Sequence, residues 1–306
     1  MNHNVTLFTF EDCAHETMSH DKYITISNAY NFFNHCLSFE ECFGILIENY
    51  IEFEVELLTQ TAKLSFTGQS DFDTIFDSKL VANRRLTNLL SSCRMHIDQT
   101  NKFFYNVYTK SKATTQTIQN LFSTEYEARI GYRVMHELRN ISQHESLPVQ
   151  GLTFHSNNNL STQKRSLLHL TSLHITTEFL KSTKCKQRII QELEKLSSDI
   201  ELKSFTREYI SGLCSVHNSV RLMTKDIFAS NENILVSMVQ KLQEKNNITN
   251  EKSVFGLLLF TEDDEGHVIS EQELFIDIIK EINRLRQKYR EYGELANRVI
   301  SSQVEI

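Results

Sequence analysis

The stretch Thr117–His144, TIQNLFSTEYEARIGYRVMHELRNISQH, decides the fold class of this chain. Its apolar residues recur every three or four positions, which is the spacing of one buried helix face. Pro148 follows shortly afterwards, and proline cannot continue a helix because it lacks an N–H and clashes with the preceding turn. We therefore expect one long helix that ends very near His144.

The same helical spacing extends outward on both sides. Ser38 and Glu41 have the spacing of a capping box, as do Ser270 and Glu273, and Asp73 is in position to cap a further helix. In chain order these patterns predict helices over about 38–64, 74–108, 183–196, 203–228, 231–245 and 270–299. Only one proline and eight glycines occur in 306 residues, which favours long uninterrupted helices.

Short strands are expected at a few places between the helices. Alternating or β-branched residues predict strands at Val5–Phe10, Tyr23–Ile26, Val149–Phe154, Leu167–Phe179 and Val254–Phe260. Asn157–Asn159 are expected to form a turn, and the Gly-bearing turn 263–266 predicts a hairpin. The sequence thus predicts a mainly α protein, with a bundle of long helices, a small β element at about 149–180 and a β-hairpin at about 254–269. The strand-rich stretch is the expected seam between a helical bundle with short N-terminal strands (1–148) and a mixed, mostly helical region (149–306), unless all 306 residues form one domain.

Composition limits the class of protein and its partners. The apolar fraction of 40% and the charged fraction of 23% are typical of a folded globular chain, and the net charge of −7 disfavours broad, non-specific nucleic-acid binding. The six cysteines show no C-x-x-C spacing, so we expect reduced thiols rather than disulfides or a zinc site. With no secretory leader pattern and no long apolar run, the expected location is cytoplasmic, without a membrane partner.

Arg139, Asn140 and His144 form the strongest chemical signal. Asn140 and His144 are four residues apart, so they share one helix face, and Arg139 must reach across to join them or the last turn must unwind. A histidine titrates near neutral pH and can move a proton to or from an RNA hydroxyl, while an arginine can hold two phosphate oxygens. There is no carboxylate cluster, so the sequence predicts RNA phosphodiester cleavage without a metal ion or other cofactor.

Several neighbouring residues could support such a site. Glu137, Arg133 and His136 lie along the same strip of the helix. Further along the chain, a basic run could touch a nucleic-acid backbone through Lys184, Lys186 and Arg188. Structural roles are the alternatives: an ordinary Arg133–Glu137 helix pair, a pairing of Arg139 with Glu137 or Glu145, a histidine bound to the last carbonyls of the helix, and a solvated start of the next helix.

The motif resembles R-x4-6-H of the HEPN superfamily, whose commonest active form, R-N-x-x-x-H, is matched by Arg139, Asn140 and His144. The resemblance covers the third helix and, loosely, the bundle of about 38–148. It implies a metal-independent endoribonuclease of toxin–antitoxin or antiviral defence systems that acts as a homodimer with two motifs facing each other, and it implies an antitoxin or another defence-system protein as a possible partner. Here the motif is followed at once by Glu145–Pro148, so the helix stops rather than continuing past the histidine.

Two alternatives stay open at the level of sequence. The helical bundle could be a non-catalytic binding or regulatory module that uses the same pocket for a nucleotide or a protein partner. Near the N-terminus, His3, His15 and His20 with Asp12, Glu16 and Asp21 could form a metal site, although the spacing matches no established ligand pattern and solvated turn residues are the simpler interpretation.

Overall fold

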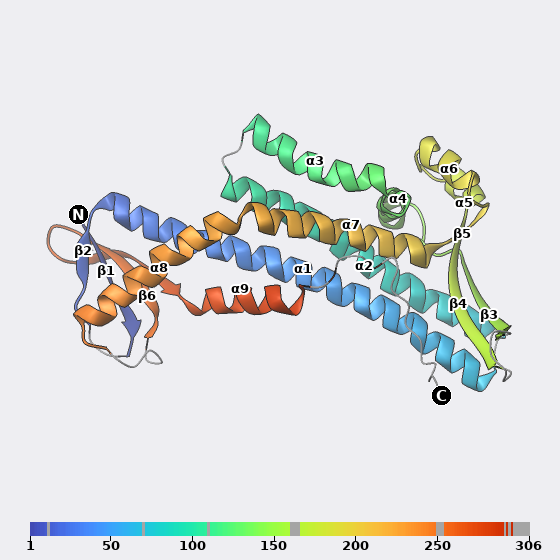
Figure 1. The fold of residues 1–306 in the computed structure, drawn as a ribbon, viewed down its shortest axis with the longest axis horizontal. Helices are drawn as coiled ribbons and strands as arrows, with labels where there is room; N and C mark the ends of the chain where they lie inside the picture. The colour runs from blue at the N-terminus through green and yellow to red at the C-terminus, as the bar shows by residue number, and fades with distance from the viewer. Residues whose placement is uncertain are drawn as a thin grey trace. The chain divides into compact units, whose positions relative to one another are not determined.

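The computed structural model describes residues 1–10, 13–68, 71–108, 111–159, 166–248 and 254–290, together with Tyr292 and Leu295. These residues form the following helices: α1 (His20–Thr67), α2 (Phe72–Val107), α3 (Lys112–Ala128), α4 (Ile130–His144), α5 (Thr177–Lys181), α6 (Gln187–Glu194), α7 (Leu202–Met223), α8 (Lys225–Lys245) and α9 (Asp277–Lys288). The strands are β1 (Asn2–Thr9), β2 (Glu16–Met18), β3 (Gly151–Asn159), β4 (Ser166–Thr176), β5 (Asp199–Glu201), β6 (Val254–Glu262) and β7 (Val268–Phe275). The mainly α class, the small β element and the hairpin are confirmed (Figure 1).

The chain divides into two compact units, each made of segments that are separated in sequence. The first unit contains Met1–Glu41, Gln99–Thr114 and Val220–Arg290, and the second contains Cys42–Asp98, Thr115–Ser219 and Glu291–Ile306. Helices α1, α2, α3 and α7 contribute residues to both units. No helix in the described part of the chain combines the length and the apolar character needed to span a membrane.

A four-stranded antiparallel sheet organises the first unit, in the order β2-β1-β6-β7, with α8 against it (Figure 1). The buried face of the sheet carries Val5, Leu7, Leu257 and Leu259, which alternate with more exposed residues as in a half-buried sheet. Gly266 has a φ of +88°, a conformation that glycine adopts without strain, and it closes the β6–β7 hairpin at the predicted turn.

Two predicted helix starts in the first unit are wrong. The first helix begins at His20 rather than near Ser38, so Tyr23–Ile26 is helical and not a strand, and Ile26 is buried on the inner side of α1. Ser270 and Glu273 lie in β7, where they pair with Thr261 and Leu258 of β6, and the last helix begins only at Asp277. At the first place the buried face of α1, and at the second the backbone pairing of β7 with β6, outweighs a local capping signal, which is worth about 1 kcal/mol.

The second unit contains a helical bundle and a three-stranded antiparallel sheet in the order β3-β4-β5. The sheet is joined to the helices by side chains: the Thr61 hydroxyl of α1 donates to Thr171 Oγ1 of β4 at 2.7 Å, and Asn83 of α2 accepts from the backbone N–H of Val149 at 2.8 Å. Leu173 and Ile175 of β4 are fully buried, as the predicted alternation requires.

The predicted single helix 117–144 is interrupted. Arg129 is extended (φ −125°, ψ 118°) and separates α3 from α4, which run in different directions (Figure 1). The N–H of Gly131, at the start of α4, donates to the Glu208 carboxylate of α7 at 2.8 Å. A carboxylate from another helix thus caps α4, and no residue near Arg129 in the sequence announces this partner.

Four smaller boundaries also differ from the prediction. Asp71, not Asp73, caps α2, because its carboxylate accepts from the Thr74 N–H at 2.8 Å. Asn157–Asn159 continue β3 and pair with residues 166–168 of β4. Helix α6 begins at Gln187, and the short α5 before it is capped by the Thr176 hydroxyl. Thr224 ends α7, so the break within the predicted 203–228 helix comes earlier than expected.

Candidate functional site

Helix α4 carries the predicted motif on its partly exposed side. Its apolar face is buried in the second unit and includes Val134, Met135, Leu138 and Ile141. Arg139 and Asn140 are half-buried, and His144, the last helical residue, is exposed. The N–H of Glu145 donates to the Ile141 carbonyl at 2.8 Å, which closes the last turn. The helix therefore ends at His144, as predicted.

Arg139 is joined to the motif face by its side chain. Its Nη1 donates to Asn140 Oδ1 at 3.1 Å, and α4 stays helical through His144. Of the two possibilities left open by the sequence, the guanidinium reaches across and the last turn does not unwind. Arg139 Nε is buried and has no hydrogen-bond partner among the described residues.

Helix α2 supplies a cation that sequence reasoning missed. Gln143 of α4 donates to Ser91 Oγ of α2 at 3.4 Å, and Arg94 lies one helical turn beyond Ser91. Arg94 pairs with Asp98 four residues along, an ordinary surface contact, and no spacing in the sequence connects it to the motif on α4. Only the packing of α2 against α4 brings Arg94 close enough for its charge to act on His136.

His136 lies among these charges. Burial lowers the pKa of this imidazole, Glu137 opposes the change, and the positive charges of Lys186, Arg94 and Arg139 lower the pKa further. The ring of His136 lies edge-on to Tyr126 at 6.0 Å. His136 therefore favours its neutral form, in which one ring nitrogen can accept a proton.

Glu137 is a buried carboxylate, and its partner comes from the basic run. Lys186 Nζ lies 2.8 Å from Glu137 Oε1 and 3.4 Å from the Tyr126 hydroxyl. The contact with the Glu137 carboxylate is the largest cause of the raised pKa of Lys186. Glu145, the residue that follows α4, accepts from the backbone N–H of Lys184 at 3.1 Å. The segment 184–186 thus lies along α4 beside the motif.

The other two basic candidates, Arg188 and Lys184, differ in whether an acidic side chain pairs with them. Arg188 pairs with Glu127 at 2.9 Å and with Glu192 at 3.1 Å. Lys184 is exposed, and its ammonium has no ionic partner within the described ranges. Of the three predicted nucleic-acid contacts, Lys184 keeps a charge that no acidic side chain neutralises.

Arg133 has structural partners rather than a place at the motif. Its guanidinium binds Glu192 of α6 at 2.7 Å and donates to the backbone carbonyls of Tyr126 and Glu127 at 2.8 and 2.7 Å. It therefore ties the end of α3 to α4 and α6. The alternative of an Arg133–Glu137 helix pair is wrong, since Glu137 pairs with Lys186 instead.

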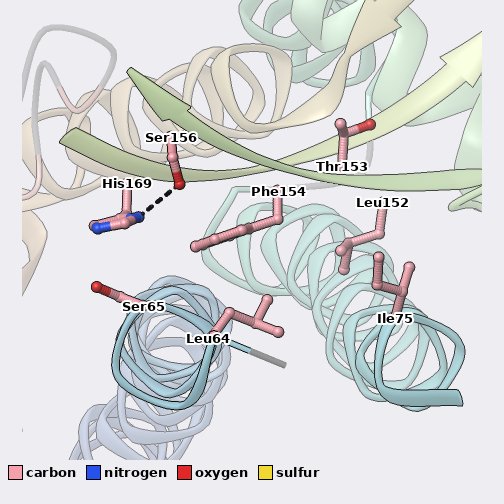
Figure 2. A pocket seen from close by; sticks show the side chains of 9 residues that line it. Leu64, Ser65, Ile75, Leu152, Thr153, Phe154, Ser156 and His169 are labelled. Atoms are coloured by element: carbon pink, nitrogen blue, oxygen red, sulfur yellow. Dashed lines mark hydrogen bonds between the residues drawn. The ribbon is translucent and has the colours of Figure 1, made fainter. Parts of the chain in front are cut away.

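A separate pocket of about 500 Å³ lies between the β3–β4 hairpin and the adjoining ends of α1 and α2 (Figure 2). Leu64, Ile75, Leu152 and Phe154 supply apolar walls, and at one side Ser156 Oγ lies 2.8 Å from His169 Nδ1. None of its lining residues belongs to the α4 motif. Among the residues that the structure describes, no three His, Cys, Asp or Glu side chains converge as metal ligands would.

The site on α4 thus gathers a phosphate-binding type of residue, Arg139, with an amide, an exposed imidazole and further cations. Comparison with models of known protein families, with curated proteins and with solved structures found no match to this chain.

Proposed function

We propose that this protein is a metal-independent endoribonuclease of the HEPN type, with Arg139, Asn140 and His144 at the reacting phosphate. The observation that carries the proposal is the Arg139–Asn140 hydrogen bond, because it draws the guanidinium toward the helix face that bears His144.

The residues have distinct roles in the proposed reaction. The ribose 2′-oxygen attacks the adjacent phosphorus, a bond forms between them, and the bond from phosphorus to the 5′-oxygen breaks. One imidazole removes the 2′-hydroxyl proton and another acid protonates the leaving 5′-oxygen. Arg139 stabilises the negative charge that grows on the non-bridging oxygens, and Asn140 orients Arg139.

A second copy of the chain would supply the second imidazole. His144 is exposed at the end of α4, so two copies could present two such residues to one phosphate. His136 is half-buried and favours its neutral form, which fits a supporting position behind the motif. The exposed Lys184 would contact the RNA backbone beside the site. The biological setting that this activity fits is a toxin or anti-phage defence system.

The test is cleavage of a fluorescently labelled RNA oligonucleotide in EDTA. We expect wild-type protein to give 2′,3′-cyclic phosphate and 5′-hydroxyl ends, and His144→Ala to reduce the rate by about 10²–10⁴-fold. His155→Ala, which removes another exposed histidine of the same unit, is the matched control and should cut normally. A 2′-O-methyl oligonucleotide should resist cleavage because it lacks the attacking hydroxyl.

The result also separates the enzyme from the non-catalytic binding module. The same donors of Arg139 could hold a phosphate without cleaving the chain. Binding of the 2′-O-methyl oligonucleotide that depends on Arg139, with no cleavage of unmodified RNA, would support the module. Cleavage that persists equally in Arg139→Ala and His144→Ala would exclude the proposed site.

A further inference from the structure

Strand β7 forms an open edge of the sheet in the first unit. It is the last strand in the order β2-β1-β6-β7, and among the described strands it pairs only with β6. The ladder with β6 is regular from Ser270 to Phe275, and a bulge at Ile269 ends this regular part. Every second residue of an antiparallel edge strand directs its backbone N–H and C=O away from the sheet. The regular part of β7 therefore offers a row of backbone donors and acceptors to a further strand.

Two carboxylates lie next to each other on one face of this edge. Glu271 is the cross-strand partner of Phe260, and Glu273 is the partner of Leu258. Because side chains alternate along a strand, this face is the one turned away from the buried Leu257. Both carboxylates are exposed, and neither has an ionic partner among the residues that the structure describes. The edge thus carries two negative charges that nothing in the described chain neutralises.

An aromatic cluster borders the two carboxylates. Phe275, the next residue on the same face, is 45% exposed, and its ring lies edge-on to that of Phe8 at 5.3 Å. Phe8 in turn contacts Phe255 at 5.9 Å, and Phe10, which is 92% exposed, contacts the same ring at 4.9 Å. Along β7 the face therefore reads acidic, acidic, apolar at every second residue, and its apolar end continues into a partly exposed cluster.

We propose that β7 is the docking edge for an extended segment of a partner protein, which adds a fifth strand to the sheet and carries two basic side chains and one apolar side chain at alternate positions. Directly opposed side chains of neighbouring strands lie about 4.5–5.5 Å apart. Lys or Arg of the segment would thus pair with Glu271 and Glu273, and the apolar side chain would lie against Phe275. In this mode of recognition the ladder hydrogen bonds supply affinity and the alternating side chains supply specificity.

Charge complementarity selects this occupant over the others. A second copy of the chain fits poorly, because an antiparallel pair of β7 strands centred on Gln272 places Glu271 of each copy opposite Glu273 of the other, and like charges directly opposed are destabilising. The net charge of −7 acts in the same sense. The phosphates of a nucleic acid or of an anionic lipid would meet the same repulsion. The edge belongs to the first unit and the Arg139 motif to the second, so this interaction goes beyond the proposed function.

The test measures binding of the fluorescein-labelled peptide TVTKTKTVT to the full chain by fluorescence anisotropy. Its two lysines have a valine on either side, so the peptide serves both parallel and antiparallel addition. We expect saturable binding and slower amide hydrogen exchange in β7. The peptide TKTVTVTKT has the same composition with the charged and apolar positions exchanged, and it should bind about tenfold more weakly. Methylation of alternate backbone nitrogens of TVTKTKTVT should abolish binding in one of the two possible patterns and be tolerated in the other, because only every second N–H faces β7.

Charge reversal on the protein supplies the matched variants. Glu271→Lys/Glu273→Lys should weaken binding of TVTKTKTVT by about tenfold and should gain binding of the acidic peptide TVTETETVT. Glu244→Lys/Glu265→Lys changes the net charge equally at exposed positions outside β7, and it should leave the affinity for both peptides nearly unchanged. Circular dichroism and thermal unfolding of each variant establish that the fold is kept.

The outcomes that overturn the proposal are distinct. Equal affinities for TVTKTKTVT and TKTVTVTKT would mean that net charge alone attracts the peptide. Tolerance of both methylation patterns would exclude a ladder with β7, and unchanged binding by the charge-reversed variant would exclude the two carboxylates. Absence of saturable binding at millimolar peptide would contradict the proposal as a whole. RNA cleavage does not enter any of these measurements, so the result is independent of the proposed function.

Discussion

Glu137 and Lys186 form an ion pair, with Lys186 Nζ 2.8 Å from Glu137 Oε1, although they lie on opposite sides of the β3–β4 hairpin in the sequence. The pair joins the helix that carries the candidate catalytic residues to the basic segment expected to touch nucleic acid. The carboxylate is buried, whereas the ammonium is largely exposed. Lys186 therefore has a structural task that its place in a basic run does not reveal.

The two neighbouring lysines are expected to differ in what their removal changes. Lys186→Ala leaves the buried Glu137 carboxylate without its cation and should lower the free energy of unfolding by about 1–3 kcal/mol. Lys184→Ala removes an exposed charge and should leave stability unchanged. It should weaken binding of a 2′-O-methyl RNA, and the dependence of log affinity on log salt should fall by about 0.7, the value for one single-strand phosphate contact. Urea unfolding and fluorescence anisotropy measure the two quantities; equal stability losses in both variants would contradict this division.

Gly131 is expected to resist substitution because α4 starts against α7. A Cβ at this position would lie 2.7 Å from the Phe205 carbonyl oxygen and 2.7 Å from Glu208 Cβ. We expect Gly131→Ala to lower the free energy of unfolding by about 1–3 kcal/mol, the usual cost of overpacking. Gly151→Ala is the control, since its Cβ would meet only His174 Cβ at an ordinary 3.5 Å. A neutral or stabilising effect of Gly131→Ala in thermal and urea unfolding would show that α4 does not pack so closely.

Stability is expected to depend on pH through His136. Burial lowers the pKa of its imidazole in the folded state, so between that pKa and the unfolded value of about 6.5 the unfolded chain binds more protons. The free energy of unfolding should therefore fall as pH drops below about 6.5, and His136→Gln should flatten this dependence. Burial also lowers the pKa of His35, so His35→Gln should remove a separate part of the pH dependence of the free energy of unfolding. Urea unfolding between pH 5 and 7.5 tests this, and an unchanged slope in His136→Gln would refute the assignment.

Glu40 is expected to be a major contributor to the first unit. It is fully buried and accepts from Arg221 Nε at 3.1 Å and from Arg286 Nε at 2.8 Å, which links α1 to α7 and α9. Glu40→Ala leaves two arginines without their shared carboxylate, and we expect a loss of about 3–5 kcal/mol. The exposed Glu281–Arg284 pair offers a matched comparison, and Glu281→Ala should have little effect because solvent screens it. Similar unfolding midpoints for the two variants would argue against this role of Glu40.

Most of the helical architecture could be predicted from the sequence because it rests on local periodicity. Apolar spacing and turn chemistry predict the apolar helix face that ends at His144, the end of that helix before Pro148, the β3–β4 pair and the hairpin at Gly266. The adjacency of Asn140 and His144 on one helix face follows in the same way, since a helix repeats every 3.6 residues. These features depend on residues that are near one another in the chain.

Tertiary structure decided the features in which distant residues compete with a local signal. The break at Arg129 depends on Glu208 of α7, which caps Gly131, and the strand at Ser270 depends on its pairing with Thr261. The Glu137–Lys186 pair and the meeting of His3 with His20 likewise join segments far apart in the chain. The sequence by itself determined the helices and the motif, because local spacing sets which face is apolar. Which charge meets which was decided only by packing, because a buried carboxylate or imidazole takes the partner that folding brings within reach.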